Sequence, residues 1–127
     1  MAIVHFTLAV RDVRRAARFF ESTLLWRPID RPGNIALASA WLEIAPGQEV
    51  HLLEVAGYSP SPFEREYGRH IAVSAPKAEF PMLKQRLQEH GAQVFAAERA
   101  TPFDRFFFRD GDGYVFEVVE AERAPET

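Results

Sequence analysis

Apolar and polar residues alternate strictly at the start of the chain, and the alternation predicts a strand over residues 3–10. Its apolar face carries every second residue: Val4, Phe6, Leu8 and Val10. The intervening positions put His5 on the opposite face. Asp12 is a suitable N-cap, and the apolar residues after it recur at helical spacing: Val13, Ala16, Ala17, Phe20 and Leu24. We therefore expect a helix from residue 13 to about 25, packed on the Phe6/Leu8 face.

Turn-forming residues divide the remainder of the first half into short strands. They are Pro28, Pro32, Gly33, Pro46 and Gly47. One or two short strands are expected near residue 28, and a further strand over 34–44 carries Trp41. A turn at 46–47 then leads into an apolar strand over 49–55, which has His51 as its central polar residue.

The second half follows the same order of elements. Residues 69–73 predict a strand with His70, and a helix carrying Pro81 in its first turn should end at His90–Gly91. Strands are expected over 94–97 and 103–109, followed by an Asp-Gly-Asp-Gly turn at 110–113. The last strand, residues 114–119, has Glu117 as its central polar residue, and residues 121–127 should form a polar tail.

Two repeated spacings indicate a tandem arrangement. The polar residue of an apolar strand recurs at 117 − 51 = 66 positions, and the histidine of an opening strand recurs at 70 − 5 = 65. We therefore predict two modules, residues 3–55 and 69–120, joined by a linker at 56–68. Because 127 residues are too few for two independent cores, the modules should form a single α+β domain.

Composition narrows the possible functions. The chain is 47% hydrophobic and 26% charged, which is typical of a globular protein, and its net charge of −3 gives no basic footprint for nucleic acid. No apolar run has the length of a membrane span. The absence of cysteine excludes disulfides, thiolate metal sites and a cysteine nucleophile, and it agrees with a cytoplasmic location.

Four polar residues occupy repeat-related strand positions that face away from the predicted helices: His5, His51, His70 and Glu117. Taken singly, each has an ordinary explanation, since a strand histidine is usually not a ligand and Glu117 has a possible partner in Arg105. Taken together, the set predicts a metal site, because a carboxylate between valines needs a cation, a donor or a proton. His90 is explained by its helix end.

These motifs resemble the vicinal oxygen chelate superfamily, which includes glyoxalase I, bleomycin and fosfomycin resistance proteins and extradiol dioxygenases. The resemblance covers about residues 3–120. It rests on the tandem βαβββ order, on Glu49–Glu54 around His51, on Gly68–Val73 around His70 and on Asp110–Glu117. It implies two modules whose mixed sheet curls into a cup with the helices outside. It also implies a homodimer and a divalent metal on the four residues that match the family's ligands.

The resemblance further implies a glyoxalase-like lyase or isomerase whose small substrate binds through two adjacent oxygens, with Glu117 carrying the proton. The alternatives are an iron extradiol dioxygenase and a protein that sequesters a ligand without turnover. Nickel, manganese, iron, cobalt and zinc all accept these ligands. Four further residues are weaker candidates for contact with the substrate: Trp41, Arg69, Arg105 and Phe107.

Overall fold

A computed structural model describes residues 1–123, and these form two compact units that meet between Tyr58 and Ser59 in the sequence. Of the expected polar tail, residues 124–127 lie outside the described residues. The organisation of both modules into one domain stays a prediction. No helix within the described range is long and apolar enough to cross a membrane.

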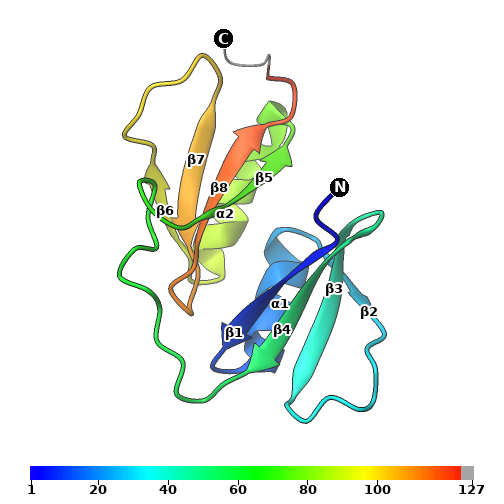
Figure 1. The fold of residues 1–127 in the computed structure, drawn as a ribbon. Coiled ribbons are helices and arrows are strands. Elements are labelled where there is room, and N and C mark those ends of the chain that lie inside the picture. The colour runs from blue at the N-terminus through cyan, green and yellow to red at the C-terminus, as the bar shows by residue number, and fades with distance from the viewer. Residues whose placement is uncertain (124–127) are drawn as a thin grey trace. The chain divides into compact units, whose positions relative to one another are not determined.

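The first unit is a four-stranded mixed sheet with a helix on one face (Figure 1). Its elements are β1 (His5–Val10), α1 (Val13–Thr23), β2 (Arg27–Ile29), β3 (Ser39–Ala45) and β4 (Gln48–Glu54). The strand order is β1-β4-β3-β2, with β1 and β4 parallel and the other neighbours antiparallel. Of the apolar face predicted for this strand, Leu8 and Val10 are fully inaccessible to solvent, whereas Val4 precedes β1 and is exposed.

Helix α1 begins as predicted and ends earlier. Asp12 caps it, because the Asp12 side chain accepts a hydrogen bond from the Arg15 amide at 3.1 Å. The helix stops at Thr23 rather than near residue 25, and Leu25 takes a left-handed φ of 61°. This reversal lets Trp26 turn inward, where its ring stacks on Phe20 at 5.0 Å.

The second unit repeats this plan. Its elements are β5 (Ile71–Ala75), η1 (Lys77–Glu79), α2 (Phe80–Glu89), β6 (Gln93–Ala96), β7 (Arg105–Arg109) and β8 (Val115–Glu120). The strand order β5-β8-β7-β6 is the same as in the first unit, with β5 and β8 as the parallel pair. The predicted α+β class with tandem βαβββ modules is therefore confirmed.

Four strands begin two or more residues later than the sequence suggests, and one of them is β1, which starts at His5 instead of residue 3. Strand β3 starts at Ser39 instead of residue 34, β5 at Ile71 instead of 69, and β7 at Arg105 instead of 103. His70 consequently lies just before β5, where its backbone is outside the ladder. The predicted end of α2 is correct: His90 is its C-cap, the His90 Nδ1 atom is 2.9 Å from the Arg86 carbonyl, and Gly91 has a positive φ of 88°.

The turn before β8 also forms as predicted. The Asp110 carboxylate accepts hydrogen bonds at one oxygen from the amides of Asp112 (3.0 Å) and Tyr114 (2.9 Å), and Gly113 adopts a φ of 94°. Burial raises the pKa of Asp110 to about 7, and the nearby Asp112 charge adds to the effect, although the backbone hydrogen bonds oppose it.

Candidate metal-binding site

Strand register places the four candidate ligands in the same way in both units. In the first unit Thr7 pairs with His51 across β1 and β4, and His5 lies two residues before Thr7. In the second unit Ala72 pairs with Glu117 across β5 and β8, and His70 lies two residues before Ala72. Because strand side chains alternate, each histidine and its diagonal partner share one face of the sheet.

In the first unit the two histidines contact each other directly. The rings of His5 and His51 are stacked, with centroids 4.1 Å apart and an interplanar angle of 20°. Trp41, which pairs with His51 across β3 and β4, stacks on the His51 ring at 3.5 Å. The aromatic contacts hold the His51 imidazole in a fixed plane, and the residue is only 8% exposed.

Glu49 is a functional candidate that the sequence reasoning missed. One of its carboxylate oxygens lies 2.8 Å from His51 Nε2. The signal was present in the sequence, because residues two apart in a strand share a face and Glu49 precedes His51 by two. Its carboxylate adds a negative charge beside the histidine pair, which favours a cation there.

In the second unit a histidine meets a carboxylate. His70 Nε2 lies 3.4 Å from Glu117 Oε1, and His70 Nδ1 lies 3.3 Å from the Arg65 carbonyl oxygen. Since a carbonyl can only accept, Nδ1 is the donor, and Nε2 is the atom that faces Glu117. A histidine ligand commonly donates its other ring nitrogen in this way. Phe107 contacts the His70 ring edge-on at 5.4 Å.

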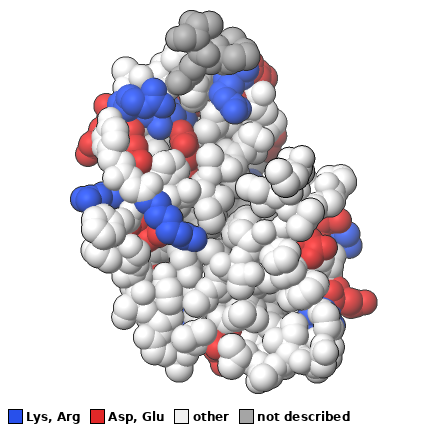
Figure 2. All heavy atoms as spheres, viewed as in Figure 1, with Lys and Arg blue, Asp and Glu red and all other residues white. Residues whose placement is uncertain are grey.

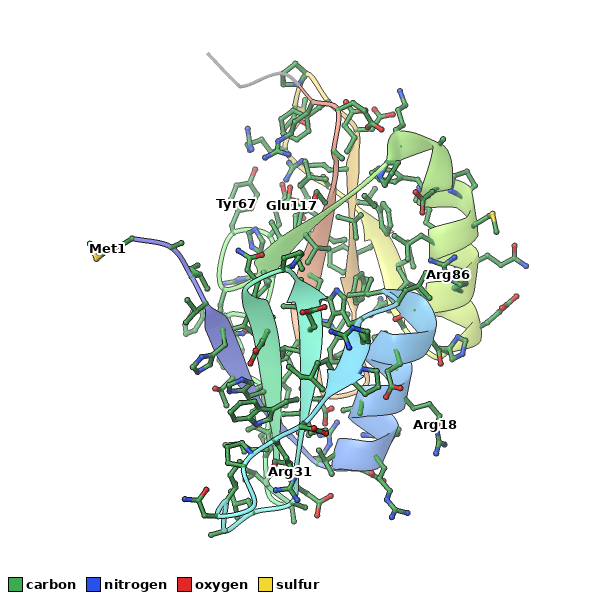
Figure 3. All side chains as sticks on the ribbon, turned by 90° about the vertical axis from the view of Figure 1, so that its right-hand side faces the viewer. Met1, Arg18, Arg31, Tyr67, Arg86 and Glu117 are labelled. Atoms are coloured by element: carbon green, nitrogen blue, oxygen red, sulfur yellow. The ribbon has the colours of Figure 1, made fainter. Side chains whose placement is uncertain are left out.

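The spacing of this pair fits two neighbouring ligands of one ion. With metal–ligand distances of about 2.1 Å, donors at octahedral or tetrahedral angles lie about 3.0–3.4 Å apart. The 3.4 Å between His70 Nε2 and Glu117 Oε1 is at the upper end of that range and long for a charge-assisted hydrogen bond. Figure 3 shows Glu117 on the face of the second sheet opposite to α2, which carries Arg86.

The second oxygen of Glu117 is held by Arg105, the partner that the sequence suggested as an alternative to a metal. Arg105 Nη1 donates to Glu117 Oε2 at 2.9 Å, and Nη2 donates to Glu66 Oε2 at 3.0 Å. The side chains are 5% (Arg105), 9% (Glu66) and 12% (Glu117) exposed. Burial lowers the pKa of the Arg105 guanidinium, but the hydrogen bonds and charges of both carboxylates outweigh it and raise the pKa.

Glu66 was also missed, and the sequence held no signal for it. It lies in the segment between the predicted modules, where no periodicity assigns a face. Burial raises the pKa of the Glu66 carboxyl, but hydrogen bonds from the amides of Glu98 and Arg99 and the contact with Arg105 lower it further, so the net shift is downward. Glu66 is therefore an anionic anchor for Arg105.

The four weaker candidates for substrate contact differ in what their side chains touch. Trp41 and Phe107 contact His51 and His70, respectively, and Phe107 is fully buried and stacked on Phe95 at 5.5 Å. Arg69 donates to the buried Glu64 carboxylate at 2.8 Å. A pocket of about 280 Å³ in the second unit is lined by Arg65, Glu66, Tyr67, Phe95, Ala96, Glu98 and Arg109. Figure 3 shows Tyr67 on the same side of this sheet as Glu117.

Within residues 1–123, no group of three or more histidine, aspartate or glutamate side chains is placed to hold a metal ion. The structure brings together His5 with His51, and His70 with Glu117. Each unit thus supplies two donors of a type that transition metals accept, and a protein metal site needs three or four. The donor chemistry of both pairs fits a divalent transition metal.

On the face shown in Figure 2, acidic and basic residues are intermixed among uncharged ones.

The model of the glyoxalase/bleomycin resistance protein/dioxygenase superfamily matches residues 2–118. "Glyoxylase I 4" of Arabidopsis thaliana is 25% identical over 127 residues, which cover 95% of this chain and 71% of that protein.

Solved structures with the same fold include the fosfomycin resistance protein FosX of Listeria monocytogenes. Its monoclinic crystal form is 23% identical, with a TM-score of 0.77 over 94% of this chain and 90% of that chain. A variant of that protein was crystallised with Mn(II) and 1S,2S-dihydroxypropylphosphonic acid, and it matches at 22% identity with a TM-score of 0.74 over 93% of this chain and 88% of that chain.

The match of the family model over nearly the whole chain, with the repeated βαβββ units, confirms the resemblance to the vicinal oxygen chelate group. This chain belongs to the glyoxalase/bleomycin resistance protein/dioxygenase superfamily.

Proposed function

We propose that the protein is a metal-dependent, glyoxalase-like lyase or isomerase that acts on a small substrate with two adjacent oxygens. One divalent ion would be held by His5, His51, His70 and Glu117. The observation that carries this proposal is the repeated diagonal placement of the two donor pairs, with the same two-residue offset in both parallel strand pairs. If the four side chains had no common role, there would be no reason for both units to place their donor pair with the same offset.

The ion, when bound, would act as a Lewis acid on the substrate oxygens. The protein's part is proton transfer. Glu117 would loosen from the ion, take a proton at Oε1 from the carbon beside the substrate carbonyl and return it at another position, since its Oε2 is occupied by Arg105. His70 Nε2 lies 3.4 Å from the same oxygen and would stay on the ion as a ligand during the transfer. Four protein ligands leave two of six positions for the substrate.

The walls of the site suggest how a substrate would be enclosed. Trp41 and Phe107 lie against the proposed ligands and would supply its apolar surface. Arg69 and Arg105 each already hold a carboxylate, so a substrate contact by either one would compete with Glu64 or Glu117. We expect Arg69, which is 48% exposed in its side chain, to be the more available of the two.

A second candidate is an iron extradiol dioxygenase. It is favoured by the His70–Glu117 pair, because one further histidine, His5 or His51, would complete the two-histidine, one-carboxylate set of such enzymes. A ligand-sequestering protein without turnover is a third possibility, for which the Trp41 surface would serve. Oxygen uptake with catechols in the presence of ferrous iron distinguishes the dioxygenase. Turnover of any substrate excludes sequestration alone.

Metal binding itself is tested by titration calorimetry with the divalent ion alone. Replacing any of the four residues by alanine should weaken binding tenfold or more, since even the loss of an outer-shell partner typically costs ~10–100-fold. His90→Ala is the matched control, because His90 only caps α2. Equal affinities for His70→Ala and His90→Ala would refute the site.

The proposal includes a homodimer that works in the cytoplasm. Both parts rest on the family resemblance, and the second also on the absence of cysteine. Light scattering at tens of micromolar protein tests the assembly, and a monomer there would contradict it. The two pairs would serve one ion either within one chain or across two copies.

A further inference from the structure

Arg105 sits at the centre of a buried ionic chain that ends on a proposed metal ligand. From the start of β7 its side chain extends over the Phe107 ring, with the guanidinium carbon 5.4 Å from the ring centroid. Strand register explains the reach: Phe107 pairs with Glu117 across β7 and β8, and Arg105 is two residues before Phe107 on the same face. The guanidinium therefore arrives beside the Glu117 carboxylate.

Both terminal nitrogens of Arg105 donate hydrogen bonds, and Nη2 uses both of its hydrogens. Nη1 donates to Glu117 Oε2 at 2.9 Å, while Nη2 donates to Glu66 Oε2 at 3.0 Å and to the Arg99 carbonyl at 2.7 Å. The side chain is only 5% exposed. A substrate contact by either terminal nitrogen would therefore have to compete with these carboxylates or fit beside them.

The far end of the chain is fixed to the backbone. Glu66 accepts hydrogen bonds from the amides of Glu98 at 2.7 Å and of Arg99 at 3.0 Å, one on each carboxylate oxygen. Two backbone donors from the segment between β6 and β7 therefore hold Glu66, and Glu66 in turn holds Arg105. The position of the guanidinium is determined by the 98–99 segment rather than by Glu117 alone.

The arrangement has a cost that stability alone does not explain. Arg105 Nε is buried and has no hydrogen-bond partner within residues 1–123, and a buried donor without a partner is unfavourable for folding. Two carboxylates and one guanidinium also leave one negative charge uncompensated. The Oε1 atom of Glu117, which Arg105 does not contact in this arrangement, faces His70 Nε2 and would face the ion.

We propose that Arg105, anchored by Glu66, is a positioning residue that occupies Glu117 Oε2 and thereby presents Oε1 as a single-oxygen ligand. The inference rests on the proposed function, since it requires Glu117 to bind a metal. A carboxylate free to bind through both oxygens would fill one more coordination position, and the position that Arg105 keeps open is the one that a chelated substrate needs.

The test uses a charge-neutral pair of substitutions. Glu66→Gln/Arg105→Gln removes one negative and one positive charge together, so the net charge beside the ion is unchanged and a change in affinity reports position. Co²⁺ alone is the probe, followed by its visible absorption, which responds to coordination number. We expect Co²⁺ binding to weaken ~10–100-fold and the absorption band to change.

The same pair is then placed in a Glu117→Ala background. A residue that acts through Glu117 has nothing left to act on there, so the affinity should equal that of Glu117→Ala alone. Arg109→Gln is the control, because Arg109 lies on the same strand and face and also donates two hydrogen bonds, to the carbonyls of Gly113 and Glu64, each at 3.0 Å. It should keep wild-type Co²⁺ affinity and absorption.

Each outcome decides one of the two ideas. Unchanged Co²⁺ binding in Glu117→Ala and His70→Ala overturns the proposed function itself. If Co²⁺ binding is lost in those two variants, the proposed function stands. The positioning role alone is then overturned by either of two results: wild-type binding in the charge-neutral pair, or a loss caused by the pair that is just as large when Glu117 is already alanine. If the charge-neutral pair does not melt cooperatively, Arg105→Lys carries the same test, since lysine keeps the charge but lacks the fork that spans two carboxylates.

Discussion

Asp110 offers a sharp test of the electrostatics of the turn before β8. The residue is 9% exposed, and its carboxylate accepts two backbone hydrogen bonds at one oxygen. Asp110→Asn keeps a carbonyl oxygen for both amides and removes the buried charge. We therefore expect the variant to be more stable than the wild type wherever the wild-type carboxyl is ionised.

The sign and magnitude follow from the raised pKa of Asp110, which moves from 3.8 to about 7 on folding. Between these values the folded state holds more protons than the unfolded state, so the stability contribution is fully present below pH 4 and is lost as the pH rises through 7. A shift of about 3 pKa units corresponds to a limit of about 4 kcal/mol. The advantage of the variant should grow from nearly zero at pH 4 to its full size at pH 8.

Urea denaturation of both proteins at pH 4.5, 6 and 8 measures this difference directly. Thermal melts give a second measure of the same difference. A gain of 1 kcal/mol corresponds to roughly 4 °C in melting temperature for a domain of this size, so a shift on the order of 10 °C is expected at pH 8. Asp30→Asn, at an exposed loop position, controls for the loss of one charge. A stability difference between Asp110→Asn and wild type that is the same at all three pH values would refute the reasoning.

Three further predictions follow from the described contacts. Gly113→Ala should destabilise the protein by at least ~1–2 kcal/mol in chemical denaturation, because φ is 94° and a Cβ would lie 2.6 Å from Pro60 Cβ, whereas Gly111→Ala meets no atom within 4 Å and should cost much less; equal effects would contradict the strain argument. Asp12→Ala removes the N-cap bond of α1 and should cost ~1 kcal/mol, measured by the shift of the urea midpoint, and an unchanged midpoint would count against the cap. Adding Co²⁺ at a hundred times its dissociation constant should stabilise the wild type by ~2.7 kcal/mol in a thermal melt and leave His70→Ala almost unchanged at the same concentration; a similar rise in both would place the ion elsewhere.

The sequence by itself determined the repeated plan of the chain. Strict alternation in β1 and helical spacing in α1 are local properties, so the burial of Leu8 and Phe20 follows from their spacing alone. The repeat was equally visible, because it is a spacing. It indicated that His5 and His51 correspond to His70 and Glu117, and the parallel strand pairs place both sets on the same diagonal. That the four bind one metal stays a prediction.

Only the tertiary structure decided what surrounds these residues. Alternation assigned Glu117 to one face of its strand. It did not decide whether Arg105 binds one of the Glu117 carboxylate oxygens, because the sequence left that pairing as one alternative. Glu66 comes from a segment without periodicity, and its role depends on contacts with residues 98 and 99, more than 30 positions away. Leu25 is similar: a positive φ in an apolar residue contradicts local preference, and it arises because Trp26 gains a buried stack on Phe20. Periodicity assigns faces within one element, whereas hydrogen-bond partners between distant segments are chosen when the chain folds.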